Sequence, residues 1–186
     1  LVILGAGESG VGAAILGKKM RYEVFLSDQN DIATELQALL VKEGILWEAG
    51  QHTLESMQEA HLVIKSPGIP SDVPLIKTLK AQGKTICSEI EFAAQHTSAT
   101  LIGITGTNGK TTTTLLTYQI LKDAGLHVGM AGNIGNSFAL QVAETDFDFY
   151  VLELSSFQLD DIQDFAPHIA VITNITPDHL DRYNYQ

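Results

Sequence analysis

Residues 103–114 read GITGTNGKTTTT, and this stretch decides the fold because an apolar run ends in a glycine turn that opens a helix. A strict phosphate-binding loop, G-x-x-x-x-G-K-[ST], would place a glycine where this chain has Ile104, so the motif present is the shortened form G-x-x-G-K-[ST]. It keeps the turn glycines, a lysine that can reach the β- and γ-phosphates, and a hydroxyl for Mg²⁺ at the helix start. The stretch therefore predicts an ATP-type triphosphate site, formed by Gly106, Thr107, Asn108, Gly109, Lys110, Thr111 and Thr112.

A second glycine turn, LGAGESG, occupies residues 4–10. Its G-x-G-x-x-G pattern follows an apolar strand and opens a helix, which is the context of a dinucleotide-binding turn. Asp28 follows the next predicted strand, where its carboxylate could accept a hydrogen bond from a nucleoside. Three interpretations remain open from these residues alone: a tight turn without a ligand, a nicotinamide cofactor site, or a site for another pyrophosphate ligand such as a UDP-sugar.

Short apolar runs alternate with amphipathic segments along the whole chain, which predicts an α/β protein with mainly parallel sheets. The polar segment AAQHTSAT at 93–100 separates two such series. We expect two successive βα domains: a Rossmann-like domain over 1–94, and a truncated P-loop ATPase-like domain over 95–186. Predicted strands lie at 1–4, 23–27, 45–49, 61–66 and 85–88 in the first series, and at 100–105, 127–131, 149–154 and 168–175 in the second.

Polar side chains follow two predicted strands of the second series. Glu153 ends the run FYVLEL, at the place where a carboxylate could hold Mg²⁺ beside the phosphates. Asp178, His179 and Asp181 follow the next strand. Each has a simpler interpretation as a solvated strand end, a helix cap or a packing residue, and the pattern alone does not decide between the two.

The composition belongs to an ordinary soluble globular protein of 186 residues, 45% hydrophobic and 18% charged. The formal net charge of −11 argues against nucleic acid or an anionic membrane as a partner. Cys87 is the only cysteine, so no intrachain disulfide forms. We find neither a signal peptide nor an apolar run of membrane-spanning length. We expect a cytoplasmic protein whose first residues are trimmed from this sequence and which continues past Gln186.

The assembled motifs resemble the Mur ligase family of ATP-dependent amide-bond synthetases. GITGTNGKTTTT is similar to that family's shortened phosphate loop, AGNIGNS at 131–137 to its substrate loop, and NITPDHLDRY at 174–183 to its metal and substrate segment. YVLELSSFQLD at 150–160 resembles the members that act on D-glutamate. SPGI at 66–69, SEIEF at 88–92 and GAGESG at 5–10 match as well, so the resemblance covers essentially the whole chain.

The resemblance implies two nucleotide ligands. ATP with Mg²⁺ would bind the loop at 103–114, and UDP-N-acetylmuramoyl-L-alanine would place its UDP at the first glycine turn, with D-glutamate as the incoming amine. It gives catalytic roles to Lys110, Glu153 and His179, and metal contacts to Thr111, Glu153 and His179. The UDP-substrate would contact Gly7, Ser9, Asp28, Ser66, Pro67, Gly68, Asn133, Ser155 and His179.

The chain also departs from the family pattern. The family's carbamylated lysine, its adenine-binding segment and its C-terminal amino-acid-binding domain do not occur before Gln186. We therefore expect a monomer that binds ligands but does not catalyse the full reaction by itself. Two other classes stay open: an NAD-dependent oxidoreductase with an incidental phosphate-loop turn, and a regulatory module that binds ATP without synthesis.

Overall fold

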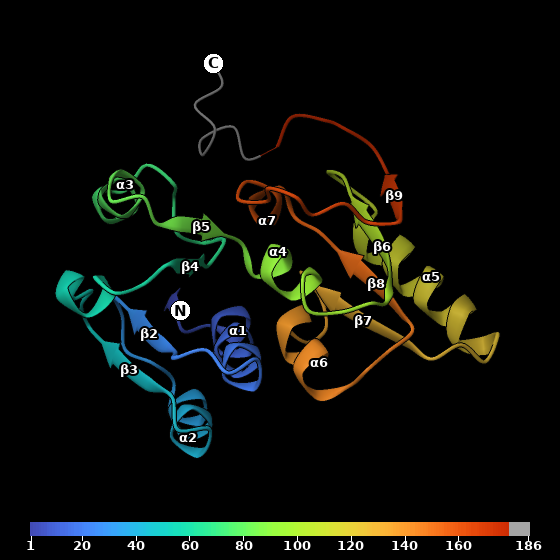
Figure 1. The fold of residues 1–186 in the computed structure, drawn as a ribbon. Coiled ribbons are helices and arrows are strands. Elements are labelled where there is room, and N and C mark those ends of the chain that lie inside the picture. The colour runs from blue at the N-terminus through green and yellow to red at the C-terminus, as the bar shows by residue number, and fades with distance from the viewer. Residues whose placement is uncertain (179–186) are drawn as a thin grey trace.

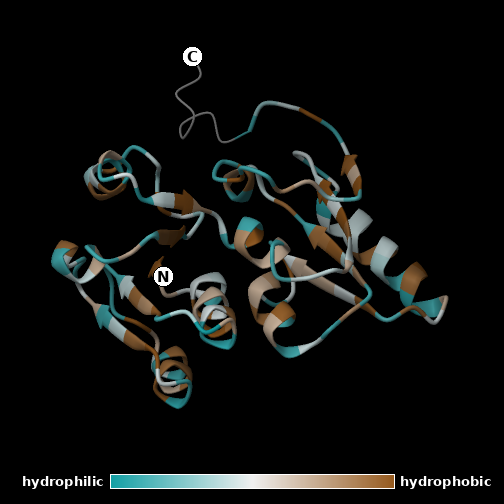
Figure 2. Cartoon of the chain, in the orientation of Figure 1, coloured by the Kyte–Doolittle hydropathy of each residue, from teal (hydrophilic) through white to brown (hydrophobic). Residues whose placement is uncertain are grey.

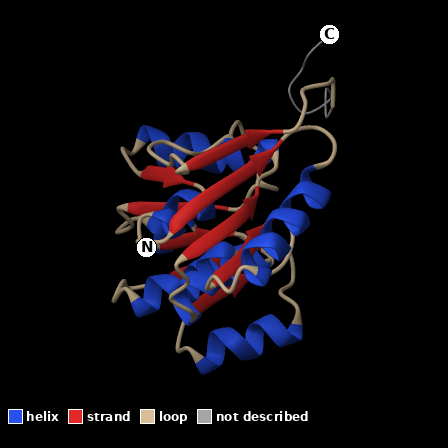
Figure 3. Cartoon of the chain, turned by 90° about the vertical axis from the view of Figure 1, so that its right-hand side faces the viewer, coloured by secondary structure: helices blue, strands red, loops and turns tan. Residues whose placement is uncertain are grey.

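The computed structural model describes residues 1–178, which form two parallel β-sheets with helices packed around them (Figure 1). His179 and Asp181 lie outside the described residues. Figure 3 shows helices on both sides of the strands, as expected where the strands are joined by right-handed crossovers. The predicted α/β class with two parallel sheets is therefore confirmed.

The first sheet has the strand order β3-β2-β1-β4-β5, and every neighbouring pair is parallel. Its central strand is apolar and fully buried, because both faces are covered. The strands are β1 (Val2–Leu4), β2 (Phe25–Asp28), β3 (Leu46–Ala49), β4 (Leu62–Lys65) and β5 (Thr85–Cys87). The helices are α1 (Glu8–Lys19), α2 (Thr34–Lys42), the short 3₁₀ helix η1 (Leu54–Met57), α3 (Pro74–Ala81) and α4 (Glu89–Ala94).

The second sheet has the order β7-β8-β6-β9, again with parallel pairs. Its strands are β6 (Thr100–Thr105), β7 (Val128–Gly132), β8 (Phe149–Glu153) and β9 (Ile169–Ile172). Its helices are α5 (Lys110–Asp123), α6 (Phe138–Glu144) and α7 (Ser156–Leu159). The strand order places the ends of β8 and β9 on either side of the end of β6, where the phosphate loop begins.

Helices α1, α4 and α6 lie between the two sheets (Figure 1), and α1 packs directly on α6. Ala13 and Ala14 of α1, with Phe138 and Ala139 of α6, are fully buried in one core that also includes residues of both sheets. Small side chains let the two helices approach closely. Figure 2 shows hydrophobic residues concentrated in the strands and in the helices between the sheets.

Serine caps begin three short helices that the sequence patterns did not predict. The hydroxyl oxygens of Ser88, Ser137 and Ser155 accept hydrogen bonds from backbone N–H groups in the first turns of α4, α6 and α7. Such caps satisfy N–H groups that have no partner within the helix. None of the helices in the described part of the chain is long and apolar enough to cross a membrane.

Candidate functional site

The phosphate loop joins the end of β6 to the start of α5, as its sequence predicts. Gly106 has a φ of 133°, and a Cβ there would lie 2.2 Å from the hydroxyl oxygen of Thr173. Only glycine fits this position. The ammonium of Lys110 donates to the carbonyl oxygens of Gly106 at 2.7 Å and of Thr107 at 3.1 Å. The lysine is thus held over its own loop by two neutral acceptors, which an anion could replace.

The segment after β9 is hydrogen-bonded to the phosphate loop, a feature that the sequence motifs did not reveal. The backbone N–H of Asn108 donates to Oδ1 of Asn174 at 3.0 Å, and Nδ2 of Asn174 donates back to the carbonyl of Asn108 at 2.7 Å. The hydroxyl of Thr107 donates to the carbonyl of Thr176 at 2.9 Å. The asparagine side chain therefore fixes the tip of the loop. In the sequence, the signal for this role was the position of Asn174 just after an apolar strand.

Glu153 ends β8 beside the phosphate loop, because its register partner in β6 is Ile104. Its side chain is 1% exposed. Oε1 accepts a hydrogen bond from Nδ2 of Asn133 at 2.8 Å, whereas Oε2 accepts none from the residues that the structure describes. A buried carboxylate oxygen without a donor is unfavourable unless a cation or a ligand satisfies it. The structure thus brings together Asn133 and Glu153, two of the predicted site residues.

A cleft of about 270 Å³ opens between the phosphate loop, α7 and the segment after β9. Gly106, Thr107 and Lys110 form one wall, and Ser155 and Asp178 contribute from the other segments. Thr111 and Thr112 lie in the first turn of α5, where both are exposed.

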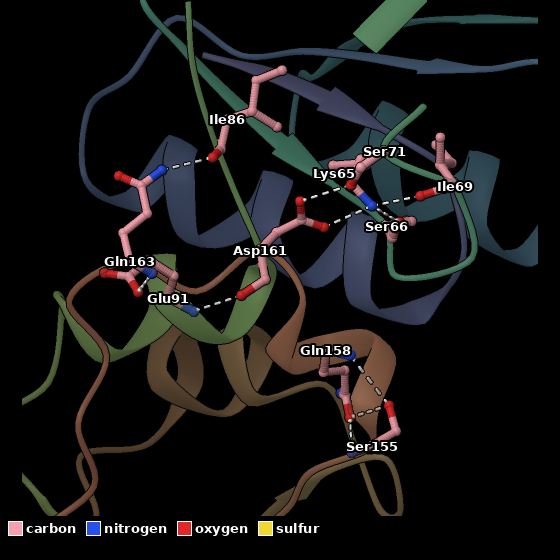
Figure 4. Close-up of polar contacts among 11 residues, drawn as sticks. Lys65, Ser66, Ile69, Ser71, Ile86, Glu91, Ser155, Gln158, Asp161 and Gln163 are labelled. Atoms are coloured by element: carbon pink, nitrogen blue, oxygen red, sulfur yellow. Dashed lines mark hydrogen bonds and ion pairs between the residues drawn. The ribbon is translucent and has the colours of Figure 1, made fainter. Parts of the chain in front are cut away.

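Ser155 also has a structural role at the cleft wall. Its hydroxyl accepts from the backbone N–H of Gln158 at 3.3 Å, and Oε1 of Gln158 accepts from the backbone N–H of Ser155 at 2.9 Å (Figure 4). This reciprocal pair is a capping box.

The first glycine turn is held by Asp28. Oδ2 of Asp28 accepts from the backbone N–H of Ala6 at 2.6 Å, and Oδ1 accepts from that of Asn30 at 2.8 Å. Gly5 has a φ of 97°, and a Cβ there would lie 2.3 Å from the hydroxyl of Ser66. The predicted nucleoside acceptor therefore already braces the turn, with further lone pairs left to accept from a ligand.

Another cleft, of about 610 Å³, lies over this turn. In chain order we call it the first cleft, and the 270 Å³ cleft at the phosphate loop the second cleft. Four of the predicted UDP-substrate residues line it: Gly7, Asp28, Ser66 and Gly68. Pro67 lies between two of them in the chain, and Ser9 is half-buried in the first turn of α1. Gly7 begins α1 without a side-chain cap, so the N–H groups of this helix start face the region that a phosphate would occupy.

His52 lines the same cleft and belongs to a polar cluster that the sequence did not indicate. The buried hydroxyl of Ser27 lies 2.7 Å from Nδ1 of His52 and donates to Oε1 of Glu48 at 2.7 Å. Burial raises the pKa of Glu48, but hydrogen bonds from Thr53 and Ser27 outweigh it and leave that pKa below its ordinary value. The cluster fixes the His52 ring at the cleft wall.

Two family models match the chain once this geometry is compared with known proteins. The model of the Mur ligase MurD-like N-terminal domain matches residues 1–88, and the model of the Mur ligase middle domain matches residues 104–186. Together they include both glycine turns, the first sheet and most of the second. The chain therefore belongs to the Mur ligase family.

Its curated relatives include proteins named UDP-N-acetylmuramoylalanine--D-glutamate ligase. The chain is 58% identical over 185 residues to the one from Bacteroides fragilis (strain YCH46) and 59% identical over 185 residues to the one from Bacteroides thetaiotaomicron. Each alignment takes in 100% of this chain and 42% of the relative. The chain thus spans 42% of the length of these relatives.

Solved structures of other ligases share the fold. A UDP-N-acetylmuramate:L-alanyl-gamma-D-glutamyl-meso-diaminopimelate ligase from Neisseria meningitides superposes with a TM-score of 0.64 at 21% identity, over 98% of this chain and 62% of that one. UDP-N-acetylmuramate-alanine ligase from Thermotoga maritima gives 0.62 at 24% identity, over 100% of this chain and 43% of that one. At these identities the likeness establishes the fold.

Proposed function

We propose that the protein is an ATP-dependent ligase that joins D-glutamate to UDP-N-acetylmuramoyl-L-alanine in peptidoglycan precursor synthesis. The observation that carries the proposal is the identity of 58–59% over this whole chain to relatives named for that substrate pair. Residues 1–94 would bind the UDP part of the precursor, and 95–186 would form part of the ATP-binding domain. We place the enzyme in the cytoplasm as a monomer.

The second cleft suits ATP with Mg²⁺. Lys110 offers an ammonium held only by neutral carbonyls, and Glu153 offers a buried carboxylate oxygen that accepts no hydrogen bond from described residues. Within residues 1–178, no group of three or more His, Cys, Asp or Glu side chains could hold a metal ion. Mg²⁺ is commonly held by one or two carboxylates together with substrate phosphates, and Glu153 would supply one such carboxylate.

Thr111 and Glu153 would hold a first Mg²⁺, and His179, outside the described residues, would help to hold a second. When bound, the metal neutralises charge on the phosphate oxygens. Lys110 would leave the carbonyls of its loop and bind the transferred phosphoryl group. Asn133 would keep the Glu153 carboxylate oriented through its 2.8 Å hydrogen bond.

The reaction needs ATP because a carboxylate is a poor acyl donor. A carboxylate oxygen of the alanyl group attacks the γ-phosphorus, the bond to ADP breaks, and an acyl phosphate forms. The amine of D-glutamate then attacks the acyl carbon, phosphate leaves, and the amine loses a proton. Holding the precursor and ATP in two fixed clefts would make the first step intramolecular in effect.

The first cleft suits the UDP moiety. The N–H groups at the start of α1 would face the pyrophosphate, while Asp28, Ser9 and the turn Ser66-Pro67-Gly68 would position the nucleoside and phosphates. Glu8 is exposed at the same helix start. Its exposure to solvent would screen its repulsion of the pyrophosphate.

The test uses the full-length protein that contains this chain, with a precursor carrying ¹⁸O in its alanyl carboxylate. We expect the released phosphate to contain one ¹⁸O atom, because the oxygen that attacked phosphorus leaves with it, and phosphate release to require D-glutamate. L-Glutamate is the matched control. Phosphate release without any amino acid would favour the regulatory ATP-binding module, and binding of NADH in place of the precursor would favour the oxidoreductase. The 186-residue chain alone should yield no product.

A further inference from the structure

A buried ion pair links the two halves of the chain (Figure 4). The ammonium of Lys65, at the end of β4, lies 2.7 Å from Oδ2 of Asp161, which follows α7. The two side chains are 1% and 7% exposed. Neither residue belongs to a motif on which the proposed function rests.

Both partners make further contacts that fix their surroundings. Lys65 donates to the carbonyl of Ile69 at 2.5 Å and to that of Ser66 at 3.4 Å, so the ammonium closes the turn 66–69. Oδ1 of Asp161 accepts from the hydroxyl of Ser71 at 3.1 Å, and its backbone carbonyl accepts from the N–H of Ser88 at 3.1 Å. A single carboxylate residue thus holds three segments of the first half of the chain.

The pair lies between the two clefts. Ser66, Gly68 and Ile69, which belong to the turn that Lys65 closes, line the first cleft. Ser156 and Leu159 of α7, which precedes Asp161, line the second cleft. A displacement of the turn therefore changes the position of Asp161, and through it the wall of the second cleft.

Stability alone does not explain such a pair. Taking two charges out of water is costly, and well-packed apolar residues at the same place are often equally stable. The pair instead fixes the local geometry, because the Lys65 ammonium must face Asp161 and the carbonyl oxygens of Ser66 and Ile69 at once. We propose that Lys65 and Asp161 are a positioning pair that couples the two clefts, so that binding of one nucleotide ligand raises affinity for the other. This inference rests on the proposed function.

The experiment measures the coupling directly in the full-length protein. UDP-N-acetylmuramoyl-L-alanine is titrated calorimetrically with and without a saturating non-hydrolysable ATP analogue and Mg²⁺. For the unmodified protein we expect the dissociation constant to fall at least about fivefold when the analogue is present, the lower end of common allosteric couplings. In the double variant Lys65→Met/Asp161→Leu, which replaces both charges by apolar side chains of similar size, we expect this ratio to fall to about one.

Controls separate positioning from folding. Lys42→Met removes an ammonium that is 75% exposed, and it should leave the ratio unchanged. If the double variant unfolds, Lys65→Gln/Asp161→Asn provides the same test with polar side chains. A merely structural pair would lower the unfolding temperature and leave the ratio intact in any variant that folds.

Each outcome decides one question. Failure of the unmodified protein to bind the precursor would overturn the proposed function. Binding without any effect of the ATP analogue, or a ratio that persists in a folded double variant, would overturn the coupling inference while leaving the proposed function in place.

Discussion

Replacing Glu153 by glutamine removes a buried negative charge and keeps the shape of the side chain. Oε2 of Glu153 accepts no hydrogen bond from a described residue, and leaving a buried acceptor unpaired costs roughly 1–3 kcal/mol. Glutamine would keep an acceptor for Asn133 and would bury an unpaired NH₂ group at the free position, but a buried neutral amide costs less than a buried unpaired carboxylate. We therefore expect a net gain of about 1 kcal/mol in the free energy of unfolding without ligand, which raises Tm by about 2–4 °C in a chain of this size.

The same substitution should weaken the response to ligand. A nucleotide at a hundred times its dissociation constant stabilises the unmodified protein by about 2.7 kcal/mol. Thermal unfolding is followed with a non-hydrolysable ATP analogue, either with Mg²⁺ or with EDTA. We expect the Mg²⁺-dependent part of the shift in Tm to disappear in Glu153→Gln and to persist in Glu144→Gln, which changes an exposed carboxylate. A lower Tm of the unliganded variant, or an undiminished effect of Mg²⁺, would refute the reasoning.

Three further substitutions probe the remaining contacts. Lys110→Ala should weaken ATP binding about 10- to 100-fold by calorimetry, because a charged contact contributes roughly 1.5–3 kcal/mol, while Tm changes little. Asp28→Ala should weaken precursor binding and leave ATP binding unaffected, with Asp28→Asn, which keeps an acceptor for Ala6, as the milder control; equal loss of both ligands would contradict the assignment of separate clefts. Burial raises the pKa of Glu91, but hydrogen bonds from three backbone N–H groups at 163–165 and from the Gln95 side chain outweigh it and hold that pKa below its ordinary value. Glu91→Gln should therefore lower the stability to urea by about 1–3 kcal/mol above pH 5, and this difference should shrink as the pH falls through the folded-state pKa; a difference independent of pH would contradict it.

Local patterns in the sequence predict the sheets and the phosphate loop well. Strand runs, helix spacing and glycine turns depend on residues close together in the chain, and each of these appears near the place that the sequence predicts. The bounds differ by a few residues: β9 ends at Ile172, whereas its predicted strand runs to residue 175. Helix α4 was missed because it is six residues long and has two glutamates in its first turn, which normally indicate an exposed segment. Both side chains are buried, and their carboxylate oxygens accept hydrogen bonds from distant residues. Glu89 accepts from Ser137 and Ala139, and Glu91 accepts from residues 163–165.

The residues of the candidate site also divide into those that local sequence marks and those that depend on distant contacts. Lys110 and Glu153 were found because a loop motif and a strand end mark them. Asn174, Lys65 and Asp161 were not, because their roles come from hydrogen bonds and an ion pair between residues 66 to 96 positions apart in the chain. A lysine is usually expected at the surface, but Lys65 is buried. Only the tertiary structure reveals that the carboxylate of Asp161 permits this burial.

Under the proposed function, the two clefts would bind anions by different means, although the chain carries a net charge of −11. Among the residues lining the second cleft, Lys110 is the only lysine or arginine, whereas those lining the first include neither. Lys65 stands close to the first cleft, but Asp161 neutralises it, so its charge does not serve a phosphate. A pyrophosphate there must rely on backbone N–H groups and the start of α1, whereas a triphosphate in the second cleft can use Lys110 and Mg²⁺. We therefore expect the first cleft to select its ligand by shape and backbone geometry, and the second by charge.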